Sequence, residues 1–137
     1  MKILFICGGN VARSQMAEAF FNSAANGKHT ASSCGTKVTV REGQKLKDKD
    51  MNIVTAMQEI GIDVSNYERK RFTPEAFETA DKVIVMVPSE NIPDYFNKNT
   101  KVIFWEVPDP FQQSLEFARN VRDRIAGLVN DFTTQLP

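Results

Sequence analysis

The sequence predicts an α/β protein, a three-layer sandwich built on a four-stranded parallel sheet. Segments with strand character alternate along the chain with segments of helical periodicity, which is the pattern of βαβ units. Two strand segments, 2–6 and 82–87, are almost continuously apolar, as expected for parallel strands covered on both faces. The 137 residues contain no repeat and no linker, and their number fits a single domain spanning 1–137.

The first half of the chain contains two predicted strands and two predicted helices. Residues 2–6 form the first strand. The helix that follows carries a broad apolar stripe and ends near 26–27, where a glycine can take a left-handed cap. A second strand is expected at 30–34 in spite of its polarity, and 36–49 is expected to be a loop. Apolar residues on one side predict a helix over 50–60.

The second half repeats this alternation. Thr73 and Pro74 predict a helix start, with the threonine as N-cap and the proline in the first turn. The third strand, 82–87, is followed by a short helix or turn and then by the fourth strand, 102–105. The last helix, 114–132, shows apolar residues at helical spacing.

Composition and charge exclude several classes of function. Seventeen basic residues balance 17 acidic ones, which argues against a general nucleic-acid binder. No apolar run approaches membrane-spanning length, so no membrane contact is expected. Two cysteines without an export signal indicate a reducing cytoplasm. The single histidine, His29, is expected at the surface, and without a C-x-x-C motif we expect neither a metal site nor a cofactor.

The residues between the first strand and the first helix carry the candidate chemistry. Residues 7–14, hereafter the 7–14 loop, read CGGNVARS. Backbone N–H groups at a helix start lack partners and the helix dipole is positive there, so this loop can bind an oxyanion. Arg13 adds a planar fork that matches two phosphate oxygens. Positive surroundings favour a thiolate at Cys7, placed for in-line attack on phosphorus; the alternative is a buried structural cysteine.

A cysteine, five residues, an arginine and a serine form the signature of cysteine-dependent phosphatases. Its position near the N-terminus resembles the low-molecular-weight protein tyrosine phosphatase family, and arsenate reductases of the same fold share it. The resemblance covers nearly the whole chain and implies a phosphatase-I-like fold with strand order 2-1-3-4. It also implies that substrate is bound by Gly8, Gly9, Asn10, Val11, Ala12, Arg13 and Ser14.

The same resemblance implies a set of supporting contacts. The segment 33–36, SCGT, resembles the serine-x-glycine segment of the family, whose serine holds the loop asparagine. Ser33 would therefore face Asn10. Because adjacent strand residues point to opposite faces, Cys34 should then point away from Cys7. Ser14 should donate a hydrogen bond to the Cys7 thiolate.

Asp109 is the candidate general acid. It follows the fourth strand, and the carboxyl ends of parallel strands share one edge of the sheet, so it should lie at the edge that carries Cys7. An isolated Asp-Pro is usually only a turn, but residues 109–111 resemble the family's Asp-Pro-aromatic motif, which implies an acid/base role. Phe111 would form a wall against an aromatic substrate or simply pack. Glu106 is the nearest alternative acid.

Two basic segments, 36–49 and 69–71, are interpreted as solvated surface. For the first, the alternative is a basic rim that attracts an anionic substrate. The basic residues of this first segment are Lys37, Arg41, Lys45, Lys47 and Lys49.

The predicted function is that of a phosphomonoesterase, specifically a protein tyrosine phosphatase. Cys7 is the expected nucleophile, Arg13 the phosphate ligand and Asp109 the general acid/base. The expected partners are a phosphorylated protein or a small phosphate ester, with phosphate, vanadate or arsenate as oxyanion ligands.

Two departures from the phosphatase pattern keep alternatives open. Ala12 stands where many phosphatases of the family carry a second cysteine, and Gln15 stands where they commonly have proline, closer to the reductases. The segment 85–96 lacks the cysteines that a thioredoxin-coupled reductase needs. The first alternative is therefore an arsenate reductase that uses an external thiol, such as glutathione with glutaredoxin. The second is a non-catalytic oxyanion-binding module.

Overall fold

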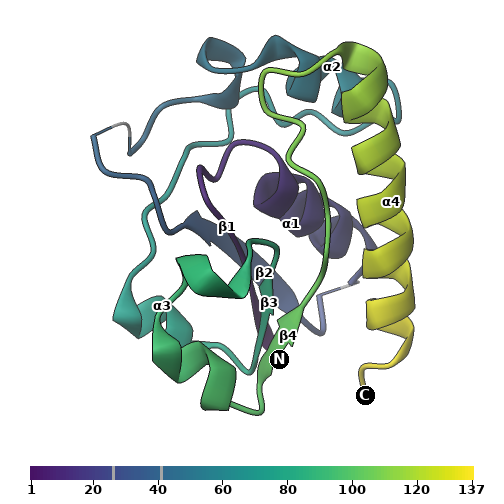
Figure 1. Ribbon diagram of the computed structural model, residues 1–137. Helices are drawn as coiled ribbons and strands as arrows, with labels where there is room; N and C mark the ends of the chain where they lie inside the picture. The colour runs from purple at the N-terminus through teal and green to yellow at the C-terminus, as the bar shows by residue number, and fades with distance from the viewer. Residues whose placement is uncertain (26, 41) are drawn as a thin grey trace.

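The central layer of the molecule is a parallel sheet of four strands, in the order β2-β1-β3-β4 that the sequence resemblance implied. The computed structural model describes residues 1–25, 27–40 and 42–137 (Figure 1). The strands are β1 (Lys2–Cys7), β2 (Thr30–Gly35), β3 (Lys82–Val85) and β4 (Val102–Phe104). All four predicted strands are therefore present, and β3 and β4 end slightly earlier than expected.

Helices cover both faces of this sheet. Figure 1 shows the long C-terminal helix on one side of the sheet and α3 on the other. The first face is covered by α1 (Arg13–Ala24), α2 (Met51–Gln58) and α4 (Leu115–Thr134). The second face is covered by α3 (Pro74–Thr79) and the short 3₁₀ helices η2 (Ser89–Asn91) and η3 (Asp94–Lys98). A further 3₁₀ turn, η1 (Leu46–Asp48), lies in the long connection before α2.

The central position of β1 explains why every residue of this strand after Lys2 is apolar and buried. Ile3 and Phe5 pack into the cluster with α1, α2 and α4, whereas Leu4 and Ile6 pack into the cluster on the opposite face. All four side chains are buried. Successive strand residues point to opposite faces, so a strand covered on both sides needs apolar residues at every position.

Polar side chains cap three of the helices at their N-termini. Asp50, Thr73 and Ser114 accept hydrogen bonds from backbone N–H groups in the first turns of α2, α3 and α4. Helix α1 has no such side-chain cap. Without such a cap, its first N–H groups can bind an oxyanion, which is the ligand that the sequence predicts there. The predicted end of this helix near 26–27 is not reached: α1 ends at Ala24, and Asn26 lies outside the described residues.

The connection 36–49 agrees only in part with its interpretation as solvated surface. Lys37, Lys45 and Lys47 are exposed, but Leu46 is completely buried in the core. Arg41 lies outside the described residues. Backbone hydrogen bonds join this connection to 65–71, so the two segments form one layer beside the 7–14 loop. None of the helices in the described ranges has the length and apolar character that crossing a bilayer requires.

Candidate active site

The 7–14 loop forms the floor of a cavity of about 130 Å³ at the carboxyl ends of the strands. A water molecule occupies about 30 Å³ in the liquid, so this space can hold one tetrahedral oxyanion. Three separate parts of the chain complete the walls. The lining residues are Cys7, Gly9, Val11, Ala12, Arg13, Lys49, Arg69, Asp109 and Phe111.

Cys7 lies at the base of this cavity beside the hydroxyl of Ser14. The sulfur is 2.9 Å from Ser14 Oγ, and both residues are buried. Asn10 Nδ2 donates to the same hydroxyl oxygen at 2.8 Å. Because Ser14 Oγ already accepts this hydrogen bond, its own proton can be directed at the sulfur. The arrangement matches the contact expected between Ser14 and Cys7.

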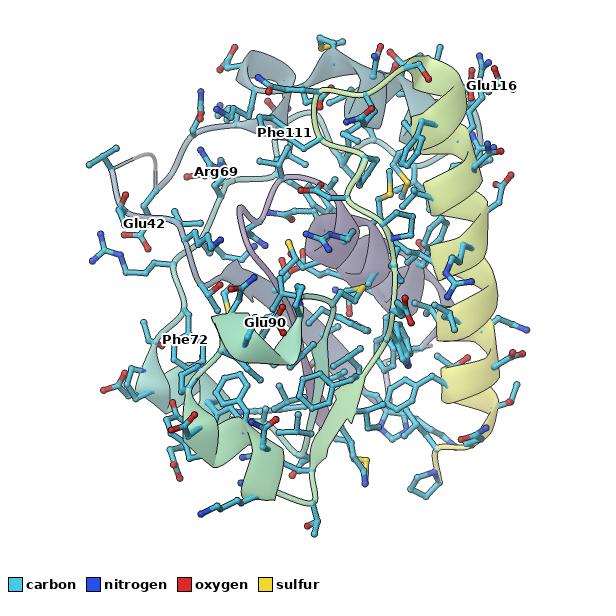
Figure 2. All side chains as sticks on the ribbon, viewed as in Figure 1. Glu42, Arg69, Phe72, Glu90, Phe111 and Glu116 are labelled. Atoms are coloured by element: carbon cyan, nitrogen blue, oxygen red, sulfur yellow. The ribbon has the colours of Figure 1, made fainter. Side chains whose placement is uncertain are left out.

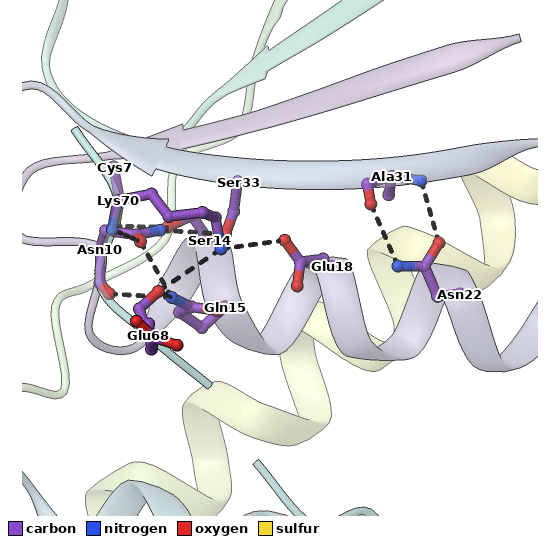
Figure 3. Close-up of polar contacts among 10 residues, drawn as sticks. All are labelled: Cys7, Asn10, Ser14, Gln15, Glu18, Asn22, Ala31, Ser33, Glu68 and Lys70. Atoms are coloured by element: carbon purple, nitrogen blue, oxygen red, sulfur yellow. Dashed lines mark hydrogen bonds and ion pairs between the residues drawn. The ribbon is translucent and has the colours of Figure 1, made fainter. Parts of the chain in front are cut away.

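Asn10 organises the loop through all of its side-chain hydrogen-bonding groups (Figure 3). Its Nδ2 donates to Ser14 and, at 3.0 Å, to Ser33 Oγ, which is the contact expected for Ser33. Its Oδ1 accepts from Gln15 Nε2 at 2.9 Å and from the backbone N–H of Lys70 at 2.7 Å. The backbone of Asn10 is left-handed, with φ of 53°, a conformation that asparagine tolerates better than most residues. Four hydrogen bonds thus hold the loop at its least favourable backbone position.

Arg13 is held from behind and leaves one edge of its guanidinium towards the cavity. Its Nη1 donates to the backbone carbonyls of Met86 and Val107. Nε is buried and has no hydrogen-bond partner among the described residues, while Nη2 lies 3.6 Å from Asp109 Oδ2. The Nε–Nη2 edge is the pair of donors that matches two oxygens of an oxyanion. An anionic ligand at this position would satisfy the buried donor.

Asp109 and Phe111 both reach the cavity from the loop after β4. Asp109 Oδ1 accepts the N–H of Phe111 at 3.0 Å, and its side chain is 54% exposed. The ammonium of Lys49 lies 5.1 Å from the centre of the Phe111 ring, a cation–π contact that fixes one wall. Glu106, the alternative acid, does not line this cavity, and its backbone carbonyl accepts from Arg124.

Arg69 is a cavity residue that the sequence interpretation missed. The segment 69–71 was expected to be solvated, which is wrong for Arg69: it is only 7% exposed. Its Nε donates to the carbonyl of Gly9 at 2.9 Å, and its Nη1 donates to Gln44 Oε1 at 3.1 Å. Figure 2 shows Arg69 and Phe111 at the same end of the molecule, where the strands terminate. Three consecutive basic residues give no signal for which one turns inward.

Gln15 links the segment that contains Arg69 to the 7–14 loop through side-chain hydrogen bonds. This completely buried side chain donates from Nε2 to Asn10 Oδ1 and, at 2.9 Å, to the carbonyl of Glu68. A proline at this position would make neither bond, since proline has no side-chain donor. The glutamine thus couples the start of α1 to the segment 68–70.

Cys34 lies on the other face of the sheet, as expected, among apolar side chains that include Leu4 and Ile6. It is 3% exposed. Burial, together with the nearby Cys7, raises the pKa of the Cys34 thiol from 9.0 to about 12. Cys34 therefore stays protonated at neutral pH, and its position does not favour a disulfide with Cys7.

We expect Cys34 to resist iodoacetamide in the folded protein at pH 8. The thiolate is the reactive form, and a pKa of about 12 leaves only about one thiol in 10⁴ ionised at that pH. Peptide mapping by mass spectrometry measures the labelling, and the protein unfolded in urea serves as the control in which Cys34 is modified. Rapid labelling of Cys34 in the native state, or a Cys7–Cys34 crosslink after peroxide treatment, would contradict this assignment.

Gly35, at the end of β2, is in close contact with the 7–14 loop. A Cβ atom built there would lie 2.5 Å from the carbonyl oxygen of Gly8 and 2.9 Å from the backbone nitrogen of Asn10. Both contacts are far shorter than van der Waals distances, and neither backbone atom can rotate away. Gly35→Ala should therefore lower the free energy of unfolding by about 1–3 kcal/mol, measured by urea denaturation. Gly127→Ala in α4 is the control, since a Cβ there meets nothing within 4 Å; equal stability of the two variants would disprove the steric argument.

Among the described residues, no group of three or more histidine, cysteine, aspartate or glutamate side chains is arranged to hold a metal ion.

The sequence is similar to members of one enzyme family along its whole length. The family model described as low molecular weight phosphotyrosine protein phosphatase matches residues 2–137. A glutaredoxin arsenate reductase from Synechocystis sp. is 30% identical, and the match covers 98% of both chains. A protein-arginine-phosphatase from Bacillus subtilis is 29% identical over 99% of this chain and 97% of its own length.

Solved structures of this family have the same fold. A low molecular weight protein tyrosine phosphatase from T. tengcongensis superposes with a TM-score of 0.83, at 28% identity and 99% coverage of both chains. A mutant of a YwlE arginine phosphatase, with a cysteine-to-serine substitution and a phosphorylated active site serine, gives a TM-score of 0.79, at 27% identity over 99% of this chain and 95% of that one. An arsenate reductase in the phosphate binding state gives 0.79, at 28% identity over 99% and 98%. As its sequence signature predicted, the chain belongs to the low molecular weight phosphotyrosine protein phosphatase family.

Proposed function

We propose that this protein is a phosphomonoesterase that forms a phosphocysteine at Cys7 and acts on phosphotyrosine in proteins. The carrying observation is the composition of the 130 Å³ cavity: the sulfur of Cys7, the open edge of Arg13 and the carboxylate of Asp109 surround a space for one oxyanion. The arsenate reductase in the phosphate binding state and the phosphatase with a phosphorylated active site serine, both relatives of this chain, support phosphate as the bound group.

In the first step, the sulfur of the Cys7 thiolate attacks phosphorus. An S–P bond forms as the bond between phosphorus and the ester oxygen breaks. Protonated Asp109 gives its proton to the departing oxygen, because a phenoxide leaves poorly without one. Arg13 holds two non-bridging oxygens through Nε and Nη2, and the Ser14 hydroxyl stabilises the negative charge on sulfur before attack.

In the second step, water attacks the phosphorus of the phosphocysteine and gives a proton to the Asp109 carboxylate. The S–P bond breaks, its electron pair returns to sulfur, and inorganic phosphate leaves. The same aspartate therefore acts as the acid in one step and the base in the next. No electron donor is needed.

Phe111 supports an aromatic leaving group. Its ring lines the cavity beside Asp109 and is held by Lys49. A phosphotyrosine ring that extends outward from the phosphate would meet this wall, and contacts between aromatic rings contribute about 0.5–1.5 kcal/mol beyond the area they bury.

An arsenate reductase is the second candidate, favoured by the glutaredoxin arsenate reductase among the relatives and by Gln15. The same donors that hold phosphate would hold arsenate. Cys7 would bind arsenic through sulfur, and the two-electron reduction to arsenite would oxidise thiols to a disulfide. Because Cys34 is buried on the opposite face as a protonated thiol, the second sulfur would have to come from an external thiol such as glutathione.

Parallel assays on one preparation separate the candidates. Hydrolysis of p-nitrophenyl phosphate and of phosphotyrosine and phosphoarginine peptides is measured beside arsenate reduction with glutathione and glutaredoxin. We expect hydrolysis with a preference for phosphotyrosine. Arsenite formation without ester hydrolysis would establish the reductase, preferred phosphoarginine cleavage would reject the tyrosine assignment, and tight phosphate binding without turnover would indicate an oxyanion-binding module.

Arg13→Lys should lower kcat/KM by about 10²-fold or more, the cost of removing a principal oxyanion donor. Lysine keeps the positive charge, but its single nitrogen cannot offer two parallel N–H groups to an anion while it also bonds the carbonyls of Met86 and Val107. Initial rates with p-nitrophenyl phosphate measure the loss. A lysine variant with kcat/KM close to that of the wild type would disprove the proposed contact of Arg13 Nε and Nη2 with two phosphate oxygens.

A further inference from the structure

A second hollow lies next to the cavity that contains Cys7. It is a groove of about 910 Å³ between the ends of β3 and β4, and it shares Arg13 and Asp109 with the smaller cavity. Its size is in the range of sites that bind whole ligands rather than single ions. The proposed phosphatase reaction uses only the smaller cavity, so the groove has no role in that chemistry.

Arg13 and Asp109, which line both hollows, form an ion pair with 3.6 Å between Nη2 and Oδ2. On the proposed mechanism, the ester oxygen departs next to the carboxyl of Asp109, because that group protonates it. The part of the substrate beyond this oxygen must therefore leave the small cavity near Asp109. Since Asp109 also lines the groove, the body of the substrate would emerge beside the groove.

The walls of the groove suit apolar side chains. Val87, Phe104, Trp105 and Pro108 contribute to them, and among the residues that the structure describes the charged ones in the lining are Arg13, Glu106 and Asp109. Phe104 is 43% exposed, although it is a large aromatic residue. It ends β4, the last strand in the sheet order β2-β1-β3-β4. Exposed apolar groups that adjoin a site mark a surface that another molecule covers.

We propose that this groove binds the polypeptide segment next to the phosphorylated residue and prefers apolar side chains there. The inference rests on the proposed function and narrows its substrate to a phosphoprotein. A small ester or arsenate has no polypeptide flank to bind in the groove, whereas a phosphoprotein would occupy both the 130 Å³ cavity and the groove.

The kinetic test compares one small ester with two phosphotyrosine peptides. The peptides differ only in having leucine or serine on both sides of the phosphotyrosine, and p-nitrophenyl phosphate is the substrate that has no polypeptide flank to occupy the groove. The wild type should prefer the leucine peptide by about tenfold in kcat/KM. Phe104→Ala should remove most of this preference and leave hydrolysis of the small ester unchanged. Phe117→Ala is the matched control, an exposed aromatic residue on α4 outside the groove, and it should change neither.

A binding test does not depend on turnover. Trp105 is the only tryptophan of the chain and lines the groove, although its ring also packs against Phe5 and Phe132, so a ligand in the groove should change its fluorescence. The Cys7→Ser variant is titrated with inorganic phosphate and with the leucine peptide, which contains no tryptophan. The peptide should shift the emission maximum of Trp105, and phosphate alone should not.

The outcomes separate the groove from the chemistry. If the wild type hydrolyses no ester, the proposed function is wrong. A shift of Trp105 emission that only the peptide causes would still support peptide binding in the groove. Equal kcat/KM for the two peptides, or a Phe104→Ala loss that is the same for the peptide and the small ester, overturns the groove proposal. So does a fluorescence change that phosphate alone reproduces.

Discussion

Cys7→Ser should abolish hydrolysis of phosphate esters while the fold and phosphate binding persist. A serine hydroxyl stays protonated at neutral pH and cannot replace the thiolate, so we expect a loss on the order of 10⁴-fold or more in kcat. The variant keeps the backbone N–H groups of the loop and the open edge of Arg13, which supply the contacts to the anion. Phosphate should therefore still protect the variant against thermal unfolding.

Cys34→Ser is the matched control for this experiment, because it makes the same chemical change at a cysteine on the opposite face of the sheet. Its kcat/KM should stay close to that of the wild type. Rates with p-nitrophenyl phosphate and melting temperatures with and without phosphate complete the comparison. Substantial hydrolysis by Cys7→Ser would remove Cys7 from the role of nucleophile.

Asp109→Asn should lower the rate by about 10²–10⁴-fold, the usual contribution of a general acid. The loss must depend on the leaving group. A tyrosyl or alkyl oxygen needs a proton to depart, whereas p-nitrophenolate is stable enough to leave with less help. Asparagine keeps the shape of the side chain and can still accept the N–H of Phe111, so the loop should retain its course. The damage should be greatest for phenyl phosphate and phosphotyrosine.

A series of aryl phosphates measures this dependence. The plot of log kcat/KM against the pKa of the leaving phenol should be steeper for Asp109→Asn than for the wild type. An equal loss across the series would mean that Asp109 acts through its ion pair with Arg13 rather than as an acid. Glu106→Gln tests the alternative acid, which lies outside the small cavity. If Glu106 donated the proton, the plot would become steeper in Glu106→Gln instead of in Asp109→Asn.

The layout of the fold followed from local patterns in the sequence. Each strand was recognised by its apolar residues or by its place between helices. The prediction of β1 was correct because a central strand that is covered on both faces favours apolar side chains on both. The least accurate points were the ends of elements. Helix α1 ends at Ala24, before Gly27, although the glycine has the left-handed φ of 82° that suggested a cap.

The candidate site was predictable where it is contiguous in sequence. The 7–14 loop and the residues 109–111 carry recognisable motifs, and the rule that parallel strands end at one edge of the sheet predicted that they would meet. Arg69 could not be found in this way. It belongs to a run of basic residues in a connection without a regular pattern, and solvation is the usual fate of such a run.

The sequence by itself thus determined the class of fold, the order of its elements and the loop that carries Cys7 and Arg13, because these depend on periodicity and on neighbours along the chain. Only the tertiary structure decided that Arg69 enters the cavity and that a groove adjoins Asp109. Arg69 turns inward because Gln15 and Asn10 bind the backbone at 68 and 70 on either side of it. These partners are more than 50 residues away in sequence, and their pairing is fixed by packing rather than by any local preference.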